Sequence, residues 1–295
     1  MRLSGMILAR TPIRRLLAGA LAILVAGAAM AQANPPRPRP TPFAPGFLLV
    51  SSRDLPRSRG AKVRVFTLRR EKGNAAPITL VMAVAPGHSA RLEVRDVKVD
   101  GLARTTYANG PCPTALATVN GSFFYHDARG FRPMGLVRVD GQTLQGPSPR
   151  TSGGFLTSDG QSIRVVPKRT PDLALAARYA VESSPILIQN GKSGMRADDG
   201  LRFDRIGVGQ AKGGAMIAVG AFGVAQKAVS LWEFEALVRA AADTLGERVT
   251  DMLAMDGGPS AHLFLPDENG GVLYGQPGRI YTPNMVCLSL KPLPR

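Results

Sequence analysis

The sequence predicts a sheet-rich α+β fold, a single domain with many short strands and one main capped helix. Three observations lead to this fold class. Apolar segments of strand length recur along the chain, and turn dipeptides such as Asp140-Gly141, Asp159-Gly160 and Asn190-Gly191 separate them, as hairpins require. Only one long segment, residues 230–246, has the periodicity of an amphipathic helix together with clear start and stop signals.

The first predicted strands lie in the N-terminal third of the chain. Residues 63–68 alternate in part between apolar and polar side chains, and residues 92–99 do so with one slip. Residues 77–85 form a nearly continuous apolar run, which is typical of a strand that is buried on both faces. Further short apolar segments, each followed by polar or turn residues, lie at 115–119, 136–139, 163–166, 185–188, 216–219, 252–255, 262–265 and 285–290.

The main helix is predicted from a capping box. Ser230 is followed three residues later by Glu233, and apolar residues then recur at helical spacing as far as Leu245. Gly246 supplies a terminating residue. A second, weaker helical pattern covers residues 172–181, and the main helix leads directly into the segment before Asp256.

The N-terminal region predicts export. Residues 1–33 combine four arginines, an uncharged apolar run and an A-x-A site, which is the pattern of a cleavable signal peptide. Residues 34–46 are a Pro-rich linker, and the folded domain is expected over residues 47–295. The sequence therefore predicts a periplasmic or secreted protein without stable membrane insertion, because no second apolar stretch reaches spanning length.

The charge of the chain limits the binding partners that are expected, and its cysteine content allows one disulfide. Loss of the four leader arginines lowers the net charge from +16 to +12, yet the basic residues are scattered and aromatic residues make up only 6% of the chain. A nucleic-acid partner is therefore not expected, whereas an anionic ligand or envelope surface is compatible with the charge. Cys112 and Cys287 form a disulfide or remain as two buried thiols, and the sequence leaves both alternatives open.

Two segments join an apolar strand to a polar, glycine-containing turn. The first places Asn120 before Gly121 and Ser122, and the second places Asp256 before Gly257 and Gly258. In each segment the strand delivers one polar side chain to its C-terminal end, and glycine lets the backbone turn closely around a ligand. Either segment taken alone is more typical of an ordinary turn than of a binding site.

Taken together, the motifs resemble those of the phosphodiester glycosidase family. The similarity extends over roughly residues 92–290, and it departs from the family pattern at Pro259, where a third glycine is usual, and at Ile206, where Thr is common. The matching motifs follow one another as Asn120-Gly121-Ser122-Phe123-Phe124, Met134-Gly135-Leu136, Asp140-Gly141, Ser184-Pro185-Ile186-Leu187, Asn190-Gly191-Lys192, Arg205-Ile206-Gly207-Val208-Gly209 and Asp256-Gly257-Gly258-Pro259-Ser260.

The resemblance implies a division of roles among these residues. A sugar-1-phosphodiester has an acidic leaving group, so its hydrolysis requires a carboxylate near the anomeric carbon and cations around the phosphate. Asp256 is the expected carboxylate, and Arg205 is the expected phosphate clamp because its planar fork suits two phosphate oxygens. Asn120 completes the expected catalytic set.

Other residues are expected to bind substrate. Ser122 would contact sugar hydroxyls or orient water, and the backbone amides of Gly257 and Gly258 would hold an anion. Ser260 ends the same loop, and Lys192 is a weaker second cation.

The remaining titratable residues are weaker candidates for a catalytic or metal-binding role. Asp204 and Asp127 are the obvious second carboxylates, although a salt bridge and a turn explain them equally well. The three histidines, His88, His126 and His262, do not stand at metal-ligand spacing, and no metal or cofactor is expected.

The sequence thus predicts an exported hydrolase that acts on a carbohydrate phosphodiester in envelope or extracellular glycans. One alternative is a non-catalytic envelope glycan-binding protein that serves exopolysaccharide assembly or export. Another is a basic protein that coats anionic envelope polymer, for which binding would be sensitive to salt. The sequence leaves the oligomeric state, the sugar and the nucleophile open.

Overall fold

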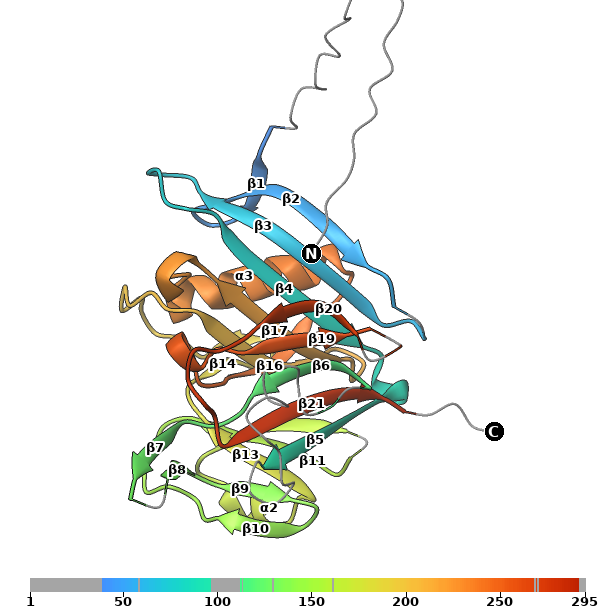
Figure 1. Ribbon diagram of the computed structural model, residues 1–295, viewed down its shortest axis with the longest axis vertical. Coiled ribbons are helices and arrows are strands. Elements are labelled where there is room, and N and C mark those ends of the chain that lie inside the picture. The colour runs from blue at the N-terminus through green and yellow to red at the C-terminus, as the bar shows by residue number, and fades with distance from the viewer. Residues whose placement is uncertain are drawn as a thin grey trace, which may run out of the picture. The chain divides into compact units, whose positions relative to one another are not determined.

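The computed structural model describes residues 39–291 apart from residues 58, 97–111, 113, 129, 161, 268 and 270. The predicted signal peptide and most of the predicted linker lie outside the described residues. The domain is rich in sheet and has few helices, as predicted (Figure 1). None of the helices in the described ranges is long and apolar enough to cross a membrane.

The largest sheet has nine strands in the order β1-β2-β3-β4-β17-β16-β18-β14-β15. Strand β4, which pairs with the central strand β17, is almost entirely buried, which confirms the prediction from the continuous apolar run at 77–85. The strand bounds are β1 Thr41–Ala44, β2 Phe47–Leu55, β3 Lys62–Arg70, β4 Ile78–Ala85, β17 Met216–Phe222, β16 Arg205–Ala211, β18 Val249–Ala254, β14 Ile186–Gln189 and β15 Lys192–Ser193.

Two five-stranded sheets and a hairpin complete the strands. The order in the second sheet is β10-β9-β13-β11-β12, the order in the third is β20-β19-β6-β21-β5, and β7 and β8 pair with each other. Their bounds are β5 Ala90–Asp96, β6 Ala115–Asn120, β7 Phe124–Asp127, β8 Gly130–Pro133, β9 Val137–Val139, β10 Gln142–Gln145, β11 Gly154–Ser158, β12 Ile163–Pro167, β13 Tyr179–Ser183, β19 Leu263–Pro266, β20 Val272–Gln276 and β21 Asn284–Leu290.

The core lies on both faces of the nine-stranded sheet. On one face, Leu80 and Met252 pack with Phe234 and Leu237 of helix α3 (Leu231–Thr244). On the other face, a second cluster joins this sheet to buried side chains of the two five-stranded sheets. The inner strands β4 and β17 therefore have continuous apolar sequences, because both of their faces are covered.

Helix α3 begins as the sequence predicts. The Ser230 hydroxyl accepts a hydrogen bond from the Glu233 amide, and the Glu233 carboxylate accepts one from the Ser230 amide. The other helical pieces are α2 (Pro171–Leu175) and the 3₁₀ turns η1 (Gly87–Ser89), η2 (Val224–Gln226) and η3 (Gly258–Ser260).

Two predicted boundaries differ from the structure. The helix expected at 172–181 ends at Leu175, and Tyr179–Ser183 instead form strand β13, because pairing with β11 buries every residue of this strand. The fold also begins before Phe47. Residues 41–44, expected to be linker, form β1 and pair with β2, since a Pro-rich segment is tolerated at the edge of a sheet.

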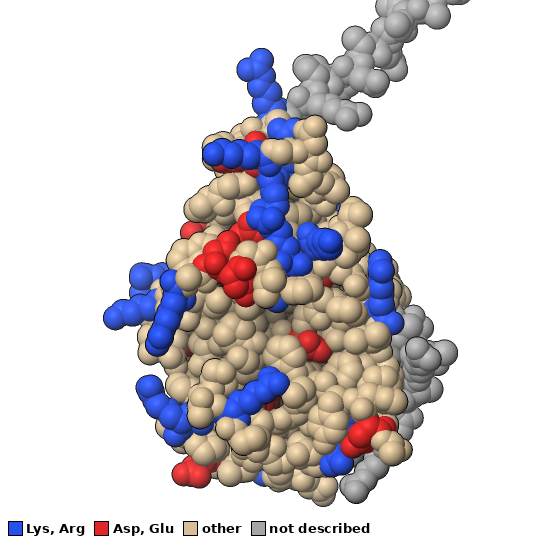
Figure 2. Space-filling model, turned by 90° about the vertical axis from the view of Figure 1, so that its left-hand side faces the viewer, with Lys and Arg blue, Asp and Glu red and all other residues tan. Residues whose placement is uncertain are grey.

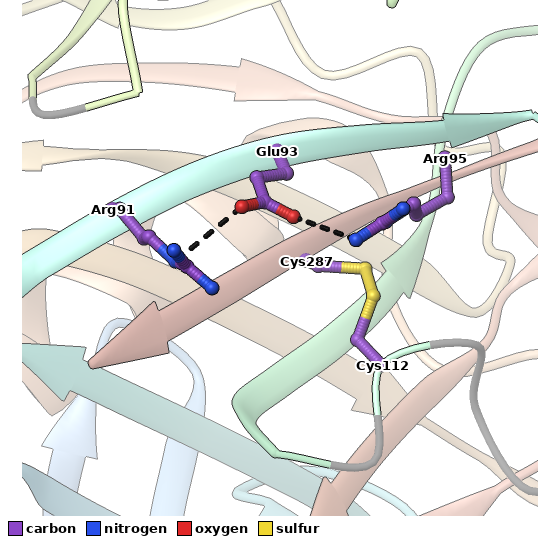
Figure 3. Close-up of a disulfide and its surroundings, with 5 residues drawn as sticks. All are labelled: Arg91, Glu93, Arg95, Cys112 and Cys287. Carbon is purple, nitrogen blue, oxygen red and sulfur yellow. Dashed lines mark hydrogen bonds and ion pairs between the residues drawn. A yellow bond between two sulfur atoms is a disulfide. The ribbon is translucent and has the colours of Figure 1, made fainter. Parts of the chain in front are cut away.

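The two cysteines form a disulfide. Cys112 precedes β6, Cys287 lies on β21, and their Cα atoms are 6.2 Å apart. Beside the disulfide, Glu93 of β5 lies between Arg91 and Arg95 and forms ion pairs with both of them (Figure 3). This arrangement resolves the alternative that the sequence left open in favour of pairing.

Candidate active site

The two glycine-containing turns of the sequence meet in space. Strand β6 of one sheet delivers Asn120, and strand β18 of another leads to Asp256. The Asp256 amide donates a hydrogen bond of 3.2 Å to the Gly121 carbonyl, and the Asn120 side-chain amide donates one of 2.8 Å to the Asp256 carbonyl. Residues that are 136 positions apart in the sequence are thereby joined at the ends of two strands.

Asn120 acts on the backbone in this structure. Its side chain is fully buried, and its Oδ1 accepts a hydrogen bond of 3.0 Å from the His262 amide while its Nδ2 bonds to the Asp256 carbonyl. Both ends of the side chain are thus used within the protein. The expected catalytic role of Asn120 stays a prediction, and the contacts show that its side-chain amide holds the backbone of the Asp256 loop.

Ser122 is also buried, and its partner is Asn284. Asn284 Oδ1 accepts from the Ser122 amide at 2.9 Å, and its Nδ2 donates to the Ser122 hydroxyl at 2.8 Å. A Cβ on Gly121 would lie 1.8 Å from Asn284 Oδ1, so only glycine permits this approach. Ser122 therefore secures the turn through Asn284, and its expected contact with sugar hydroxyls stays a prediction. Sequence reasoning missed Asn284, whose only signal is a polar residue at the start of an apolar strand.

Asp256 carries a desolvated carboxyl group. Its Oδ1 accepts a hydrogen bond of 2.9 Å from the Gly257 amide, and the Ser260 hydroxyl donates to the same carboxylate. Burial raises the pKa of Asp256 to about 6, although these two hydrogen bonds oppose the shift. A carboxyl group with this pKa exchanges a proton near neutral pH, which suits a general base or acid.

The loop amides are used within the protein. The Gly257 amide bonds to Asp256, and the Gly258 amide donates at 2.8 Å to the Asp204 carbonyl. A Cβ on Gly257 would lie 2.7 Å from that carbonyl. The expected anion-binding role of the two glycines stays a prediction, and in this structure their amides bond within the protein. The Ser260 hydroxyl contacts the Asp256 carboxylate.

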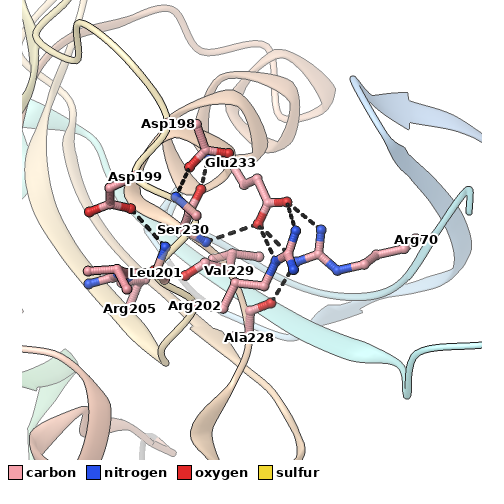
Figure 4. A network of polar contacts seen from close by, with 11 residues as sticks. Arg70, Asp198, Asp199, Leu201, Arg202, Arg205, Ala228, Val229, Ser230 and Glu233 are labelled. Carbon is pink, nitrogen blue, oxygen red and sulfur yellow. Dashed lines mark hydrogen bonds and ion pairs between the residues drawn. The ribbon is translucent and has the colours of Figure 1, made fainter. Parts of the chain in front are cut away.

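Arg205 lies beside this loop at the start of β16. Its Cδ atom is 3.7 Å from the position that a Cβ of Gly257 would occupy. The guanidinium donates from Nε to the Val229 carbonyl and from Nη2 to the Leu201 carbonyl (Figure 4). It lies 5.2 Å from the centre of the Phe203 ring. Within the described part of the chain, Nη1 has no hydrogen-bond partner, so one edge of the fork remains for an anion.

A network of ion pairs holds the segment before Arg205. Glu233 at the start of α3 accepts hydrogen bonds from Arg70 and Arg202 (Figure 4). Burial would raise the pKa of Glu233, but the hydrogen bonds from Arg70, the Ser230 amide and Arg202 lower it to about 2. Arg202 thereby ties residues 201–205 to the capped end of the helix.

Asp204 is buried beneath the Asp256 loop. Its Oδ1 accepts from the Gly223 amide at 2.8 Å, and the Ala228 amide donates to the same carboxylate. Burial raises the pKa of Asp204 to about 6, against the opposing effects of these amides and of the Arg279 charge. Asp127, the other expected second carboxylate, forms an ion pair with Arg132 in the β7–β8 hairpin.

The histidines do not form a metal site. His262 is buried, its Nδ1 accepts a hydrogen bond from the Gly278 amide, and burial lowers its pKa to about 3. His126 lies on the exposed hairpin against Phe131. The described residues contain no group of three His, Cys, Asp or Glu side chains that could hold a metal ion.

Lys192 lies away from the other predicted residues. It follows Gly191, whose amide donates to the Thr250 carbonyl near the start of β18, whereas Asp256 follows the end of that strand. Its expected role as a second substrate cation is therefore corrected. Lys192 is an exposed residue of a hairpin.

A small pocket lies among residues 123–135, 148–152 and 182–184. It encloses about 20 Å³, roughly the space of one water molecule. Ser184 of its wall precedes Pro185, whose carbonyl accepts from the Ala254 amide. The lining residues are Phe123, Met134, Gly135, Ser148, Arg150, Ser152, Glu182, Ser183 and Ser184.

Sequence reasoning also missed a buried ion pair in the wall of this pocket. Lys168 Nζ lies 2.5 Å from Glu182 Oε1, and both side chains are 8% exposed. Burial would raise the pKa of Glu182, but hydrogen bonds from Lys168, from Ser148 and from the Leu136 amide lower it. No sequence motif predicts this pair, because Lys168 follows β12 whereas Glu182 lies on β13.

Comparisons with known proteins identify one family and similar solved structures. The sequence model of the phosphodiester glycosidase family matches residues 113–288. The fold is similar to the zebrafish N-acetylglucosamine-1-phosphodiester alpha-N-acetylglucosaminidase catalytic domain auto-inhibited by pro-peptide, with 13% identity and a TM-score of 0.55 over 81% of this chain and 87% of that chain. A hypothetical protein from Synechocystis gives 14% identity and a TM-score of 0.48 over 78% of this chain and 62% of that chain. No curated protein matches the sequence.

Proposed function

The chain belongs to the phosphodiester glycosidase family, and we propose that it is an exported hydrolase that cleaves sugar-1-phosphodiester bonds in envelope or extracellular glycans. The observation that carries this proposal is the desolvated Asp256 carboxyl group, held at a strand end by Asn120 and flanked by Arg205. The disulfide supports export, because disulfides persist in oxidising compartments.

The proposed reaction replaces the bond between the anomeric carbon and the phosphate oxygen. With water as the nucleophile, the water oxygen bonds to the anomeric carbon and Asp256 takes the water proton. The broken carbon–oxygen bond leaves its electron pair on the phosphate oxygen, so the products are a free sugar and a phosphate monoester. Direct attack by Asp256 would give a covalent intermediate that water then hydrolyses.

The residues around Asp256 divide the work. Arg205 offers Nη1 to a phosphate oxygen, and its charge stabilises the negative charge that develops on the leaving group. Ser260 and the Gly257 amide orient the carboxylate. Asn120 positions the loop, and we assign it no contact with substrate.

Turnover of a small substrate panel tests the proposal. UDP-N-acetylglucosamine and several sugar-1-phosphodiesters are incubated with the wild type, with Asp256→Asn and with the control Asp172→Asn, which changes an exposed aspartate on α2. We expect free sugar from the wild type and the control, and a loss of at least about 100-fold in Asp256→Asn.

The same panel discriminates the alternative. Absence of turnover on every substrate, together with saturable glycan binding that survives Asp256→Asn, would overturn the enzymatic proposal. It would identify a glycan-binding protein of the envelope instead.

A further inference from the structure

Exposed apolar side chains gather around the loop that carries Asp256. The part of the chain that the structure describes has nine exposed large hydrophobic side chains, and four of them come from segments that contact this loop or Asp204. We call these four the apolar rim: Leu201, Phe203, Val224 and Ile280, with exposed fractions of 57%, 43%, 69% and 44%. Apolar groups gathered at one place on a surface are typical of a binding site.

Two members of the apolar rim adjoin consecutive residues of the loop. A Cβ on Gly258 would lie 3.6 Å from the Phe203 ring, which is ordinary van der Waals distance. The Ile280 amide donates a hydrogen bond of 3.3 Å to the Pro259 carbonyl. The loop residues that Phe203 and Ile280 adjoin, Gly258 and Pro259, are the second and third residues after Asp256.

The other two members come from the segments that enclose Asp204 and Arg205. The Leu201 carbonyl accepts the hydrogen bond from Arg205 Nη2 at 2.6 Å. Val224 follows Gly223, whose amide binds the Asp204 carboxylate. The apolar rim thus extends from the loop over the residues beneath it.

Cations accompany the apolar rim. The Arg205 guanidinium lies over Phe203, and exposed Arg279 precedes Ile280 and donates from its amide to the Pro259 carbonyl at 2.7 Å. Figure 2 shows one face of the molecule, on which Lys and Arg side chains are spread widely and acidic side chains also lie. An anionic group with an apolar substituent would match both features.

The composition of the apolar rim indicates which substituent it receives. Three of its members are aliphatic, and their side chains cannot hydrogen-bond to the hydroxyl groups of a glycan chain. The only aromatic member, Phe203, has Arg205 over its ring, which leaves less of it to stack on a nucleobase. A hydrocarbon is the occupant that loses no hydrogen bonds on such a surface.

We infer that the apolar rim binds the alcohol part of the phosphodiester, and that this alcohol is a lipid. The substrate class is then a sugar-1-phosphate ester of a lipid alcohol, with its phosphate at Arg205 and its hydrocarbon on the apolar rim. The inference rests on the proposed function and adds the identity of the leaving alcohol.

A chain-length series tests the inference. Substrates share one sugar and one phosphate and differ only in an alkyl alcohol from methyl to hexyl, all below their micelle concentrations. Complete burial of a methylene is worth roughly a fourfold effect, so on a half-open surface we expect kcat/KM to rise about twofold per methylene. The hexyl-to-methyl ratio of kcat/KM should then exceed about tenfold.

Substitutions test whether the apolar rim causes the dependence of kcat/KM on alkyl chain length. The double variant Val224→Ser/Ile280→Ser should reduce the hexyl-to-methyl ratio at least fivefold, whereas the control Leu173→Ser, an exposed leucine on α2, should keep it. An equal kcat/KM for methyl and hexyl substrates in the wild type would overturn the inference while leaving the proposed function intact.

Binding without turnover separates the two proposals. Calorimetry with decyl phosphate and Asp256→Asn should show saturable binding that weakens at least fivefold in the double variant. Such binding would support the inference even if no substrate were cleaved. Tighter binding of an oligosaccharide phosphate than of decyl phosphate would overturn it, because the apolar rim would then serve a glycan.

Discussion

Four wholly or partly buried carboxyl groups of this protein have pKa values that are shifted in opposite directions. Asp204 and Asp256 lie at one loop, where burial raises the pKa of each to about 6. Glu182 is buried and Glu233 is partly buried, but Lys168 pairs with Glu182 and Arg70 pairs with Glu233, and both pKa values are lowered. Desolvation acts on all four, and the cationic partner determines the direction of the shift.

This difference separates structural charge from reactive charge. A carboxylate that is paired with an arginine or lysine holds two elements together and keeps its proton off at every physiological pH. A carboxyl group that is desolvated and bonded only to amides and a hydroxyl exchanges its proton near neutrality. The loop around Asp256 is therefore the part of the molecule that is suited to catalysis.

The largest expected effect comes from a substitution that breaks the ion pair between Lys168 and Glu182. Lys168→Met leaves the buried Glu182 without its cation, and we expect a loss of about 3–5 kcal/mol in the free energy of unfolding. Urea denaturation measures the loss, with Lys212→Met at an exposed position as control. A loss below about 1 kcal/mol would show that the hydrogen bonds to Glu182 suffice without the lysine.

Glu233→Gln should weaken the fold by up to about 3 kcal/mol at neutral pH, because the pKa of Glu233 falls from 4.5 to about 2 on folding. A lowered pKa stabilises the folded state above the unfolded value, and this contribution disappears as pH falls from about 4.5 to 2. Thermal unfolding of the two proteins should therefore converge at pH 2. A difference that is independent of pH would contradict the electrostatic origin.

Asp204 should have the opposite pH dependence. The pKa of Asp204 is higher in the folded protein than in the unfolded chain. The free energy of unfolding should therefore fall by up to about 3 kcal/mol as pH rises from about 4 to 6. Asp204→Asn should remove this part of the dependence, because the amide oxygen can still accept from Gly223. Unfolding free energies of both proteins between pH 4 and 8 measure it, and parallel curves would refute the assignment.

Asp256 gives the pH dependence of activity. If its carboxylate form reacts, kcat/KM should fall about tenfold for each pH unit below about 6 and reach a plateau above that value. The profile is measured on one sugar-1-phosphodiester from pH 4 to 8. A limb that is centred near pH 4 would mean that substrate binding or another group governs the rate.

Lys192→Ala should have the smallest effect. The residue is exposed and lies toward the start of β18, so we expect less than a twofold change in kcat/KM. Steady-state kinetics beside Arg205→Lys provide the contrast, since loss of the planar fork at Arg205 should reduce kcat/KM more than tenfold. Similar losses of kcat/KM in both variants would show that Lys192 contributes to the active site.

The sequence by itself determined the elements whose signals are local. The apolar run at 77–85 predicts β4, and Ser230 with Glu233 predicts the start of α3, because periodicity and capping depend on residues only a few positions apart. The ordered motifs also led to the family, and they include Asn120, Arg205 and Asp256.

Only the tertiary structure decided what these residues contact. Asn120 turned out to hold the Asp256 loop, and Lys192 turned out to lie toward the other end of β18, because strand register determines which distant residues meet. The pairing of Glu182 with Lys168 and of Ser122 with Asn284 has no local signal. Burial and partners across sheets determine pKa, so the contrast between Asp256 and Glu182 could arise only once the chain had closed its sheets upon one another.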